Sequence, residues 1–457
     1  MIALRSYQQA MIDEARDQYR RGHNAVLLNL PTGGGKTVTA SHIVHSAADK
    51  GKVCWWLCHR RELLAQASAT FHGFDIPHST VRSGHISNPD ARVQVGSIQT
   101  IVNRLDHLPQ PDLIVFDETH HIGAASWDAI FRRFPHAKKL GLTATPWRLD
   151  GKGLGAWYSA MVTGPTPGEL IAAGSLSPFR LFAPAQPDLS DVSTVAGDYQ
   201  RSALAQAMDK PAIVGDAIGH YRRLCAGRRA VAFAVGVEHS RNIAAQFIAA
   251  GIPAEHVDGA MSDAERDAAV ERFRRGDTLI LTNADLFGEG FDVPSIEAAI
   301  LLRPTKSLSL YLQQVGRSLR PMPGKEAAII LDHAGNSIVH GLPDDERAWS
   351  LEDRPKRSKG AASENPVRQC TECFFVYRPA PICPQCGHRA VAPVREIETV
   401  EGTLEEVRRT EAMQRKREQG RADSFEALVE LGRQRGYKNP AFWASKVWAS
   451  RTGRRAA

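Results

Sequence analysis

The sequence has no apolar run of about 18 residues, the length that a membrane-spanning helix needs. Its first residues, MIALRSYQQAMIDEAR, become charged within five positions and supply no apolar core for a signal peptide. We therefore expect a soluble, cytoplasmic protein without a membrane partner. Cysteine is also scarce, because 457 residues contain only seven. This number does not suggest a disulfide framework in a chain of this length.

Most of the chain, residues 1–350, has no excess of positive or negative charge. The net charge of +7 arises beyond residue 350, where residues 351–400 carry 8 Lys and Arg against 6 Asp and Glu, and residues 401–457 carry 13 against 8. A basic end on a neutral body favours a polyanionic partner, most often nucleic acid. A solvated charged helix would have the same composition, so charge alone does not decide between the two.

Apolar runs alternate with helical patterns in two stretches, residues 1–155 and 201–343. The strands expected in the first are 25–30, 53–58, 93–98, 113–118 and 139–144. Those expected in the second are 230–235, 279–284, 298–303 and 327–332, with helices at 238–251, 262–276 and 307–319. Nearly continuous apolar strands alternating with helices indicate a parallel sheet covered on both faces. The sequence therefore predicts two α/β domains.

The remaining segments differ in composition. Residues 156–200 are rich in Gly and Pro and are expected to form a connector with little core. A charged linker is expected at 344–366, a four-cysteine segment at 367–392 and a basic helical tail at 393–457. The tail includes a charged helix near 402–420 and a helix that begins at Asn439-Pro440.

A glycine-rich turn joins the first expected strand to a helix in the stretch LPTGGGKT (30–37). Backbone N–H groups and the positive end of a helix dipole make such a turn an anion site, and glycines let the backbone approach the anion. Lys36 would reach the β- and γ-phosphates of a nucleotide, and the Thr37 hydroxyl would bind Mg²⁺. The strict phosphate-loop pattern has Gly where this chain has Leu30. A glycine turn without a ligand is the alternative.

An acidic pair ends another apolar strand, in LIVFDETHH (113–121). Asp117 would bind Mg²⁺, and Glu118 would orient or deprotonate the attacking water. The adjacent His120 and His121 suggest a zinc site, but neighbouring residues on a turn face different ways, so we do not favour metal there.

Four cysteines form the pattern C-x₂-C, nine residues, C-x₂-C, at Cys370, Cys373, Cys383 and Cys386. Four thiolates can make a closed tetrahedral zinc site, and zinc binding would supply the folding energy of so small a segment. An iron–sulfur cluster and disulfides are the alternatives. The residues between the pairs, among them Phe375 and Tyr377, would either stack on nucleic acid or form the small core of the ribbon.

Eight motifs together resemble superfamily 2 helicases of the DExH type, over about residues 1–340. In chain order they are LRSYQQ (4–9), PTGGGKT (31–37), CHRRELLAQ (58–66), GSIQTI (96–101), DETHH (117–121), LTATP (142–146), LTNADLFGEGFDVP (281–294) and QQVGRSLRP (313–321). The cysteine segment that follows is similar to that of RadD-type DNA-repair helicases and phage-encoded DEAD/DEAH-box helicases with a C-terminal zinc ribbon.

The resemblance implies two tandem RecA-like domains with ATP bound in the cleft between them. It implies catalytic roles for Lys36, Asp117, Glu118, Gln313, Arg317 and Arg320. It implies contacts to ATP from Gln8, Thr32, Gly33, Gly34, Gly35, Lys36, Thr37, Gly290 and Asp292, with Mg²⁺ at Thr37 and Asp117. Either Arg5 or Tyr7 would join Gln8 at the adenine. Thr143 and Thr145 would couple hydrolysis to domain closure.

Nucleic acid would lie on the face opposite ATP, against Arg60, Arg61, Ser97, Gln99 and Thr100. The expected function is an ATP-dependent DNA helicase or translocase in DNA repair, recombination or phage replication. A repair or replication protein would then be a partner of the zinc ribbon and basic tail. The alternatives are a DNA-stimulated ATPase that remodels protein–DNA complexes, an RNA helicase and a non-catalytic scaffold. A restriction motor subunit is disfavoured, because no nuclease motif follows residue 345.

Overall fold

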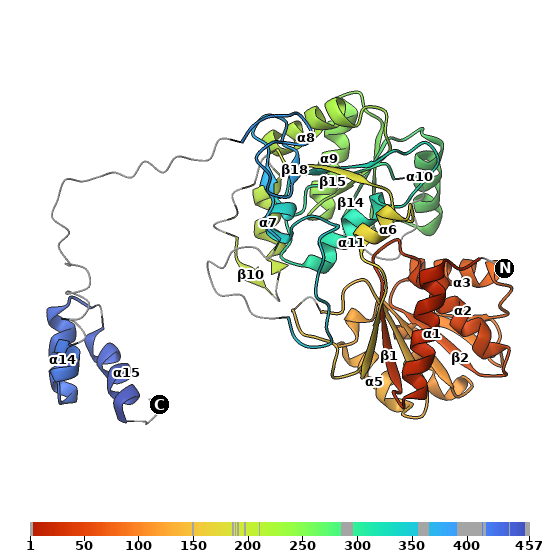
Figure 1. The fold of residues 1–457 in the computed structure, drawn as a ribbon, viewed down its shortest axis with the longest axis horizontal. Coiled ribbons are helices and arrows are strands. Elements are labelled where there is room, and N and C mark those ends of the chain that lie inside the picture. Colours follow the sequence, from red (N-terminus) through yellow and green to blue (C-terminus); the bar gives the residue numbers. More distant parts are fainter. Residues whose placement is uncertain are drawn as a thin grey trace. The chain divides into compact units, whose positions relative to one another are not determined.

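The computed structural model describes most of the chain as two compact units, residues 1–390 and 391–457 (Figure 1). The residues described are 3–148, 150–184, 187, 189, 192–195, 198–209, 211–284, 296–354, 365–390, 414, 417–437 and 439–452. Across those ranges no helix combines the length and the apolar character that crossing a membrane requires.

The first RecA-like domain contains an eight-stranded sheet in the order β4-β3-β5-β2-β6-β7-β1-β8. The strands are β1 (Ala25–Asn29), β2 (Cys54–Cys58), β3 (Ser79–Arg82), β4 (His85–Ile86), β5 (Val93–Ser97), β6 (Leu113–Asp117), β7 (Lys138–Thr143) and β8 (Ala160–Thr163). The helices are α1 (Ser6–Arg20), α2 (Lys36–Ala48), α3 (Arg61–Gly73), α4 (Ile98–Ile101) and α5 (Ala125–Arg133), with 3₁₀ turns η1 (Leu105–His107) and η2 (Thr119–His121). All pairings are parallel except β3 with β4.

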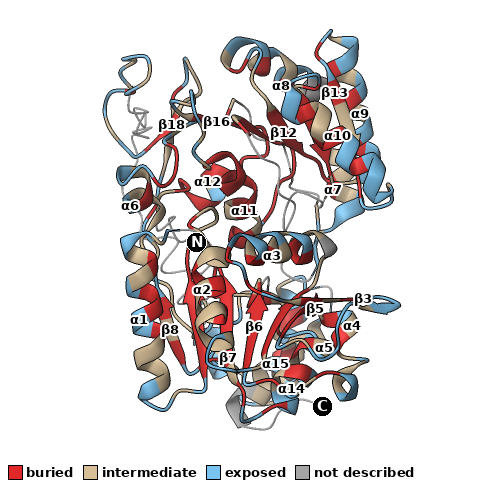
Figure 2. Cartoon of the chain, turned by 90° about the vertical axis from the view of Figure 1, so that its right-hand side faces the viewer, coloured by how far each residue is buried: buried red, intermediate tan, exposed pale blue. Residues whose placement is uncertain are grey.

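Strand β2 shows why these runs form the centre of a covered sheet. Its five residues, CWWLC, are all buried. Trp55 packs into one apolar core and Trp56 into another, so successive side chains fill cores on opposite faces. A strand covered on both faces needs apolar residues at every position, which explains why the sequence shows a continuous run. Figure 2 shows the strands in red beneath helices whose outer faces are exposed.

The second RecA-like domain contains a parallel six-stranded sheet in the order β13-β14-β12-β15-β16-β9. The strands are β9 (Phe179–Phe182), β12 (Ala230–Phe233), β13 (Ala254–Val257), β14 (Ile280–Asn283), β15 (Ala298–Leu301) and β16 (Ala328–Asp332). The helices are α6 (Pro167–Ala172), α7 (Arg201–Met208), α8 (Pro211–Leu224), α9 (Val237–Ala249), α10 (Asp263–Arg275), α11 (Leu308–Ser318) and α12 (Asn336–His340). A two-stranded sheet, β10 (Thr194–Val195) with β11 (Asp198–Tyr199), lies between β9 and α7 in the chain.

The expectation of little core in residues 156–200 is wrong for their first part. Strand β8 extends the first sheet by pairing with β1, and β9 extends the second by pairing with β16. Between the two strands, Leu170 and Leu176 are buried in the core of the second domain. These strands are only four residues long and lie among Gly- and Pro-rich turns, so the sequence pattern predicts turns rather than strands there.

The four-cysteine segment forms a small ribbon, with β17 (Arg368–Gln369) antiparallel to β18 (Val376–Tyr377). The second compact unit contains a pair of contacting helices, α14 (Phe425–Gln434) and α15 (Pro440–Thr452). Helix α15 begins where Asn439-Pro440 predicts, and Asn439 Oδ1 accepts the Phe442 N–H at 3.1 Å. Most of the charged helix expected near 402–420 falls outside the described residues.

Candidate active site

The glycine-rich turn has the backbone of a phosphate loop. Gly33 and Gly35 have φ values of +84° and +87°, in the left-handed region that side chains rarely adopt. A Cβ on Gly34 would lie 2.8 Å from Leu30 Cγ, and one on Gly35 would lie 2.4 Å from Gln8 Nε2. The left-handed backbone at Gly33 and Gly35 and the close approach of Leu30 to Gly34 explain the glycines of this turn, which leads into the start of α2.

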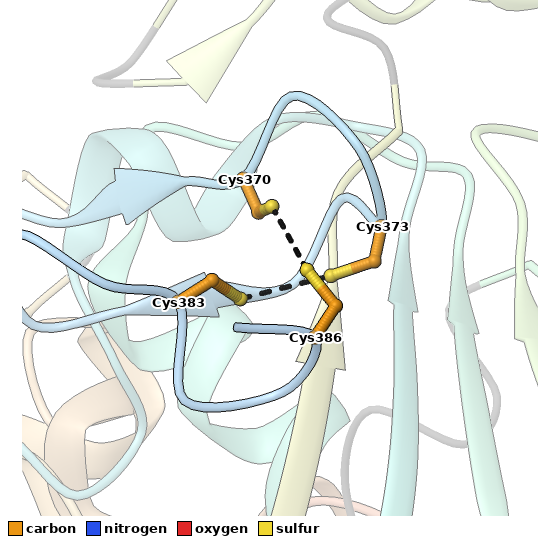
Figure 3. A group of neighbouring side chains, drawn as sticks. All are labelled: Cys370, Cys373, Cys383 and Cys386. Atoms are coloured by element: carbon orange, nitrogen blue, oxygen red, sulfur yellow. Dashed lines mark hydrogen bonds between the residues drawn. The ribbon is translucent and has the colours of Figure 1, made fainter. Parts of the chain in front are cut away.

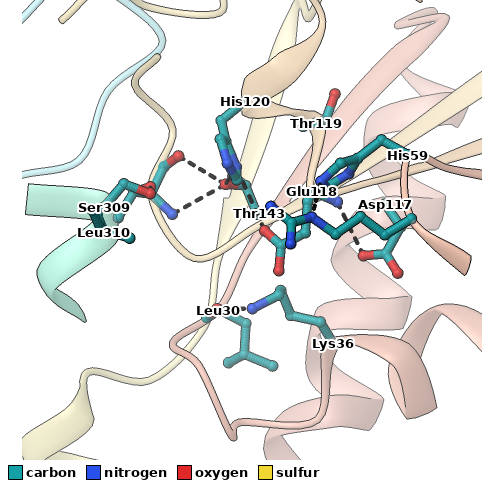
Figure 4. Close-up of polar contacts among 12 residues, drawn as sticks. Leu30, Lys36, His59, Asp117, Glu118, Thr119, His120, Thr143, Ser309 and Leu310 are labelled. Carbon is teal, nitrogen blue, oxygen red and sulfur yellow. Dashed lines mark hydrogen bonds and ion pairs between the residues drawn. The ribbon is translucent and has the colours of Figure 1, made fainter. Parts of the chain in front are cut away.

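Lys36 opens helix α2, and its Nζ donates to the Leu30 carbonyl at 3.3 Å (Figure 4). A phosphate would offer this ammonium a charged acceptor in place of a neutral one. Thr37 follows in the first turn of α2. Helix α1 also contacts the loop, because its Tyr7 hydroxyl donates to the Gly34 carbonyl at 2.8 Å.

Gln8 is buried in α1 and lies against the same loop. Its Oε1 accepts the Arg5 N–H at 2.9 Å, and its Nε2 lies 3.5 Å from the Gly35 carbonyl oxygen. The Arg5 side chain in turn donates to the Tyr7 hydroxyl at 3.1 Å. Arg5, Tyr7 and Gln8 therefore form one connected group at the loop, so the structure does not single out Arg5 or Tyr7.

Asp117 and Glu118 lie at the end of β6, beside the loop (Figure 4). Burial, together with the neighbouring Glu118 carboxylate, raises the pKa of Asp117 to about 7. A divalent cation would favour the charged carboxylate and reverse this shift. Glu118 has a left-handed backbone (φ +51°), which is unusual for a residue with a side chain and directs the chain into η2. The donor set therefore fits Mg²⁺ and a nucleotide.

A chain of polar contacts leads from Glu118 into the second domain. His120 Nδ1 lies 3.5 Å from a Glu118 carboxylate oxygen and 3.4 Å from Thr143 Oγ1. Thr143 Oγ1 donates to the Thr145 carbonyl at 2.7 Å. The Thr145 hydroxyl then donates to Ser309 on α11 at 2.7 Å, inside the protein.

Helix α11 carries the residues expected from the second domain, and it lies directly on the phosphate loop. Gln313 and Arg317 are buried in it, and Arg320 follows its end. A Cβ on Gly316 would lie 2.6 Å from Thr32 Cβ. The Gln313 amide nitrogen is buried without a hydrogen-bond partner among the described residues, as expected of a donor aimed at a ligand. Gly290 and Asp292 fall outside the described residues.

Three of the five residues expected to bind nucleic acid line a groove that both domains contribute to. Ser97, Gln99 and Thr100 line it together with His59 and Arg82 from the first domain, and Asp263 and Arg266 from the second. The Ser97 hydroxyl caps α4 by accepting the Thr100 N–H at 3.3 Å. Arg60 precedes α3 and donates to His59 at 3.2 Å, and Arg61 begins that helix. The structure therefore groups Ser97, Gln99 and Thr100 directly and places Arg60 beside them.

The four cysteines converge as a metal site requires (Figure 3). Their sulfur atoms all lie within 4.8 Å of one another, with Cys370 and Cys386 at 3.6 Å and Cys373 and Cys383 at 3.7 Å. A tetrahedron with zinc–sulfur bonds of about 2.3 Å has edges of about 3.8 Å, so the cluster fits zinc. All seven cysteines are free thiols, in disagreement with the disulfide alternative.

The aromatic residues of the ribbon have structural contacts. Phe375 packs edge-on against Phe182 of β9, with ring centroids 5.4 Å apart. Tyr377 is buried among the ribbon's own residues, against Cys370 and Cys383. Of the two alternatives for these aromatics, a structural core is the one that their burial favours.

Several residues of this site had a weak signal in the sequence or none. Ser309 and Arg266 act across the two domains, and Arg266 pairs with Glu62 on α3 at 2.9 Å. A single serine or arginine on an expected helix has no distinguishing pattern. Gly316 lay within the motif QQVGRSLRP, where a glycine inside a helix is the signal of a close approach.

Family models and relatives agree with this geometry. The model described as "Type III restriction enzyme, res subunit" matches residues 1–148, and the one described as "Helicase conserved C-terminal domain" matches residues 213–322. A 51.5 kDa protein of a Lactococcus phage (isolate 7-9) is 35% identical over 364 residues, which cover 79% of this chain and 77% of that protein. The chain belongs to helicase superfamily 2. Membership makes it an ATP-hydrolysing enzyme of the nucleic-acid motor class.

The yeast relative of this helicase is longer. The Saccharomyces cerevisiae protein IRC3, which carries the name of an ATP-dependent helicase, is 31% identical over 361 residues. The match covers 74% of this chain and 52% of IRC3, so the chain spans about half of the length of that relative. Among solved structures, a fragment of a type I restriction HsdR subunit from Vibrio vulnificus YJ016 has a TM-score of 0.59 at 23% identity, covering 75% of this chain and 68% of that one. This likeness concerns the fold.

Proposed function

We propose that this helicase is a DNA motor that couples ATP hydrolysis between its two RecA-like domains to movement along DNA or to strand separation. The observation that carries the proposal is the seating of α11 on the phosphate loop, with Gly316 against Thr32 and Ser309 bonded to Thr145. A nucleotide bound in the loop would therefore contact both domains. Closure of the domains on the nucleotide would change how tightly they bind a DNA strand.

The residues divide the chemistry between the two domains. Backbone N–H groups of Gly33–Lys36 and the Lys36 ammonium would bind the phosphates, and bound Mg²⁺ would neutralise charge on them. Glu118 would orient the attacking water or accept its proton. Arg317 and Arg320 would bring positive charge to the γ-phosphate, because a guanidinium neutralises the charge that spreads over its oxygens in the transition state.

The groove at Ser97, Gln99 and Thr100 suits a phosphate backbone, because hydroxyl and amide groups bind phosphates without reading sequence. One family model and one relative support DNA over RNA. The family model of residues 1–148 is named after a restriction enzyme. A Halobacterium salinarum relative named as a DNA 3′–5′ helicase, Rad25, is 26% identical over 377 residues, whereas relatives named as RNA helicases match over 174 residues.

The test is Lys36→Ala, with Lys52→Ala as the control. Lys52 is an exposed lysine of the same domain whose partner is Asp112. We expect Lys36→Ala to lower DNA-stimulated ATP hydrolysis by about 10²-fold or more at an unchanged melting temperature, and Lys52→Ala to retain the wild-type rate. Near-normal turnover in Lys36→Ala would contradict the site.

A second candidate is a DNA-stimulated ATPase that remodels protein–DNA complexes without unwinding. Nothing in the ATP site distinguishes it, because translocation and unwinding use the same hydrolysis cycle. A strand-displacement assay separates the two functions, since DNA-stimulated turnover without displacement of the labelled strand would favour remodelling.

A further inference from the structure

Within the described residues, the chain passes between the two RecA-like domains at two places. The first crossing follows β8, where the Gly164 N–H still donates to Asn29 of β1 at 2.9 Å and Leu170 of α6 is already in the core of the second domain. The second crossing comes after the second domain is complete. There, residues 349–354, which we call the strap, return to the first domain (Figure 1).

Backbone hydrogen bonds hold the strap on the first domain. The Gly155 N–H donates to the Leu351 carbonyl at 2.8 Å, and the Arg354 N–H donates to the Gly151 carbonyl at 2.9 Å. Trp147 Nε1 donates to the carbonyl of Glu352 at 3.0 Å. Three bonds within four residues of strap define its register, which a chance contact between surface loops would not do.

Side-chain packing matches this register. Leu351 packs against the apolar core of the first domain, and the Trp349 ring lies 4.9 Å from that of Trp147. The Asp353 carboxylate accepts the Gly153 N–H at 2.9 Å. A Cβ on Gly153 would lie 2.1 Å from the Leu351 carbonyl oxygen, so the strap approaches the loop as closely as the backbone permits.

The residues before the strap are equally well fixed to the second domain. The half-buried Arg347 side chain donates to the carbonyls of Leu342 and Asp345 at 2.9 and 2.8 Å. The Tyr311 hydroxyl on α11 donates to the Gly341 carbonyl at 3.1 Å. On the other side, the ribbon residue Arg378 pairs with Asp345 at 3.1 Å. The segment that leads into the strap is therefore attached, through Gly341, to the helix that carries Gln313 and Arg317.

The strap ends on the loop that follows Thr145. Trp147 and Gly153 belong to that loop, while Thr145 bonds to Ser309 on α11. The two crossings enclose a cavity lined by Thr163–Pro167 on one side and by Pro343, Asp345, Arg347 and Trp349 on the other, with Thr32 and Gly316 at its edge. A movement of one domain relative to the other therefore has to change the conformation of the chain at both crossings.

We propose that the strap residues are positioning residues for ATP hydrolysis: by tying the loop after Thr145 to the base of α11, they limit how far the domains separate and return α11 to the phosphate loop in register. The proposal rests on the proposed function, because coupling to DNA depends on this closure. The non-covalent attachment of the strap to the first domain narrows the range of open arrangements, and so lowers the entropic cost of closure.

The experiment uses the full chain with Gly153→Ala, in which the new methyl group collides with the strap, and Trp349→Ala, which removes the ring contact without adding atoms. Gly168→Ala at the first crossing is the control, because its Cβ would have nothing closer than 3.8 Å. Hydrogen exchange of the Gly155 and Arg354 amides reports attachment of the strap. ATP hydrolysis is measured with and without single-stranded DNA.

We expect the two amides to exchange about tenfold faster in both strap variants than in Gly168→Ala. Because closure also serves hydrolysis without DNA, that rate should fall in both strap variants, and the DNA concentration for half-maximal stimulation should rise about fivefold or more. Unchanged stimulation in variants whose strap amides exchange freely would overturn the proposal. Amides that are already unprotected in the wild type would overturn it as well.

Solution scattering separates this proposal from the proposed function. If the wild type responds to no nucleic acid, the DNA motor fails, but the strap is still tested by adding a non-hydrolysable ATP analogue. Under the proposal, the analogue compacts the wild type and Gly168→Ala but not Gly153→Ala. Equal compaction of all three would overturn the role of the strap.

Discussion

The contact between Gly316 and Thr32 predicts the effect of a single methyl group. Gly316 lies inside α11, and a Cβ there would be 2.6 Å from Thr32 Cβ and 2.8 Å from Thr32 Cγ2. Carbon atoms in ordinary contact are about 3.5–4.0 Å apart, so the Gly316→Ala variant must hold α11 about 1 Å away from the phosphate loop. The change adds no charge and removes no hydrogen bond.

The expected magnitude follows from what the helix carries. A displacement of about 1 Å at a catalytic group costs about 10²-fold in rate, or about 2.7 kcal/mol in activation free energy. We therefore expect kcat for ATP hydrolysis to fall by about that factor, with a much smaller change in KM. Folding should not suffer, because Ala inside a helix is favoured over Gly by about 1 kcal/mol.

The assay is steady-state ATP hydrolysis at saturating DNA, together with thermal unfolding. Gly219→Ala in α8 is the matched control, because a Cβ at that position has no atom within 4 Å. Adding Thr32→Gly to Gly316→Ala removes both colliding carbons and should restore part of the rate. A kcat near wild type in Gly316→Ala would refute the reasoning, and because Thr32 itself belongs to the phosphate loop, the rate of the double variant is compared with that of the Thr32→Gly single variant.

Three further predictions concern other parts of the molecule. Burial lowers the pKa of His333 to about 3 and that of His340 to about 4, so both stay neutral in the fold and the unfolded chain binds the extra protons below about pH 6.5. Each histidine then contributes a loss of stability as pH falls, about 1.4 kcal/mol at pH 5.5, while the raised pKa of Asp117 acts in the opposite direction. The urea midpoint of the wild type should therefore fall more between pH 7.5 and 5.5 than that of His340→Gln, and an equal fall would contradict this. Metal analysis should find one zinc per chain and none in Cys373→Ser, and a metal-free, fully folded wild type would exclude the zinc site. Thr145→Val and Ser309→Ala should each lower kcat about tenfold and no further in combination, since they remove one shared hydrogen bond; additive losses would show separate roles.

The sequence predicts most of the sheet strands because a doubly covered strand leaves a continuous apolar run. Strand β2 (CWWLC) is found within one residue of its expected bounds. Strands β3, β4, β8, β9 and β13 were missed, since each has four residues or fewer and lies at or next to an edge of its sheet. Pairing partners far away in the chain, rather than local pattern, decide whether such short runs become strands.

The ATP site divides in the same way. Residues that act within a short stretch of sequence leave a recognisable pattern, so the glycine turn, Lys36 and Asp117 could be proposed as site residues from their spacing. The contacts between domains could not be predicted, because nothing in the sequence around Ser309 or Trp349 indicates a partner some 160 to 200 residues away. The strap lies at the start of a segment whose composition predicts only a charged linker, and its binding depends on the shape of the loop that it meets.

The central claim is that ATP hydrolysis here is coupled to DNA through closure of two domains. The most direct measurement is steady-state ATP hydrolysis without nucleic acid and with single-stranded DNA, duplex DNA or RNA, at two salt concentrations. The account predicts stimulation by DNA that weakens as salt rises, because phosphate contacts release counterions. Stimulation by RNA alone would move the protein to RNA metabolism, and turnover that no nucleic acid changes would contradict the account.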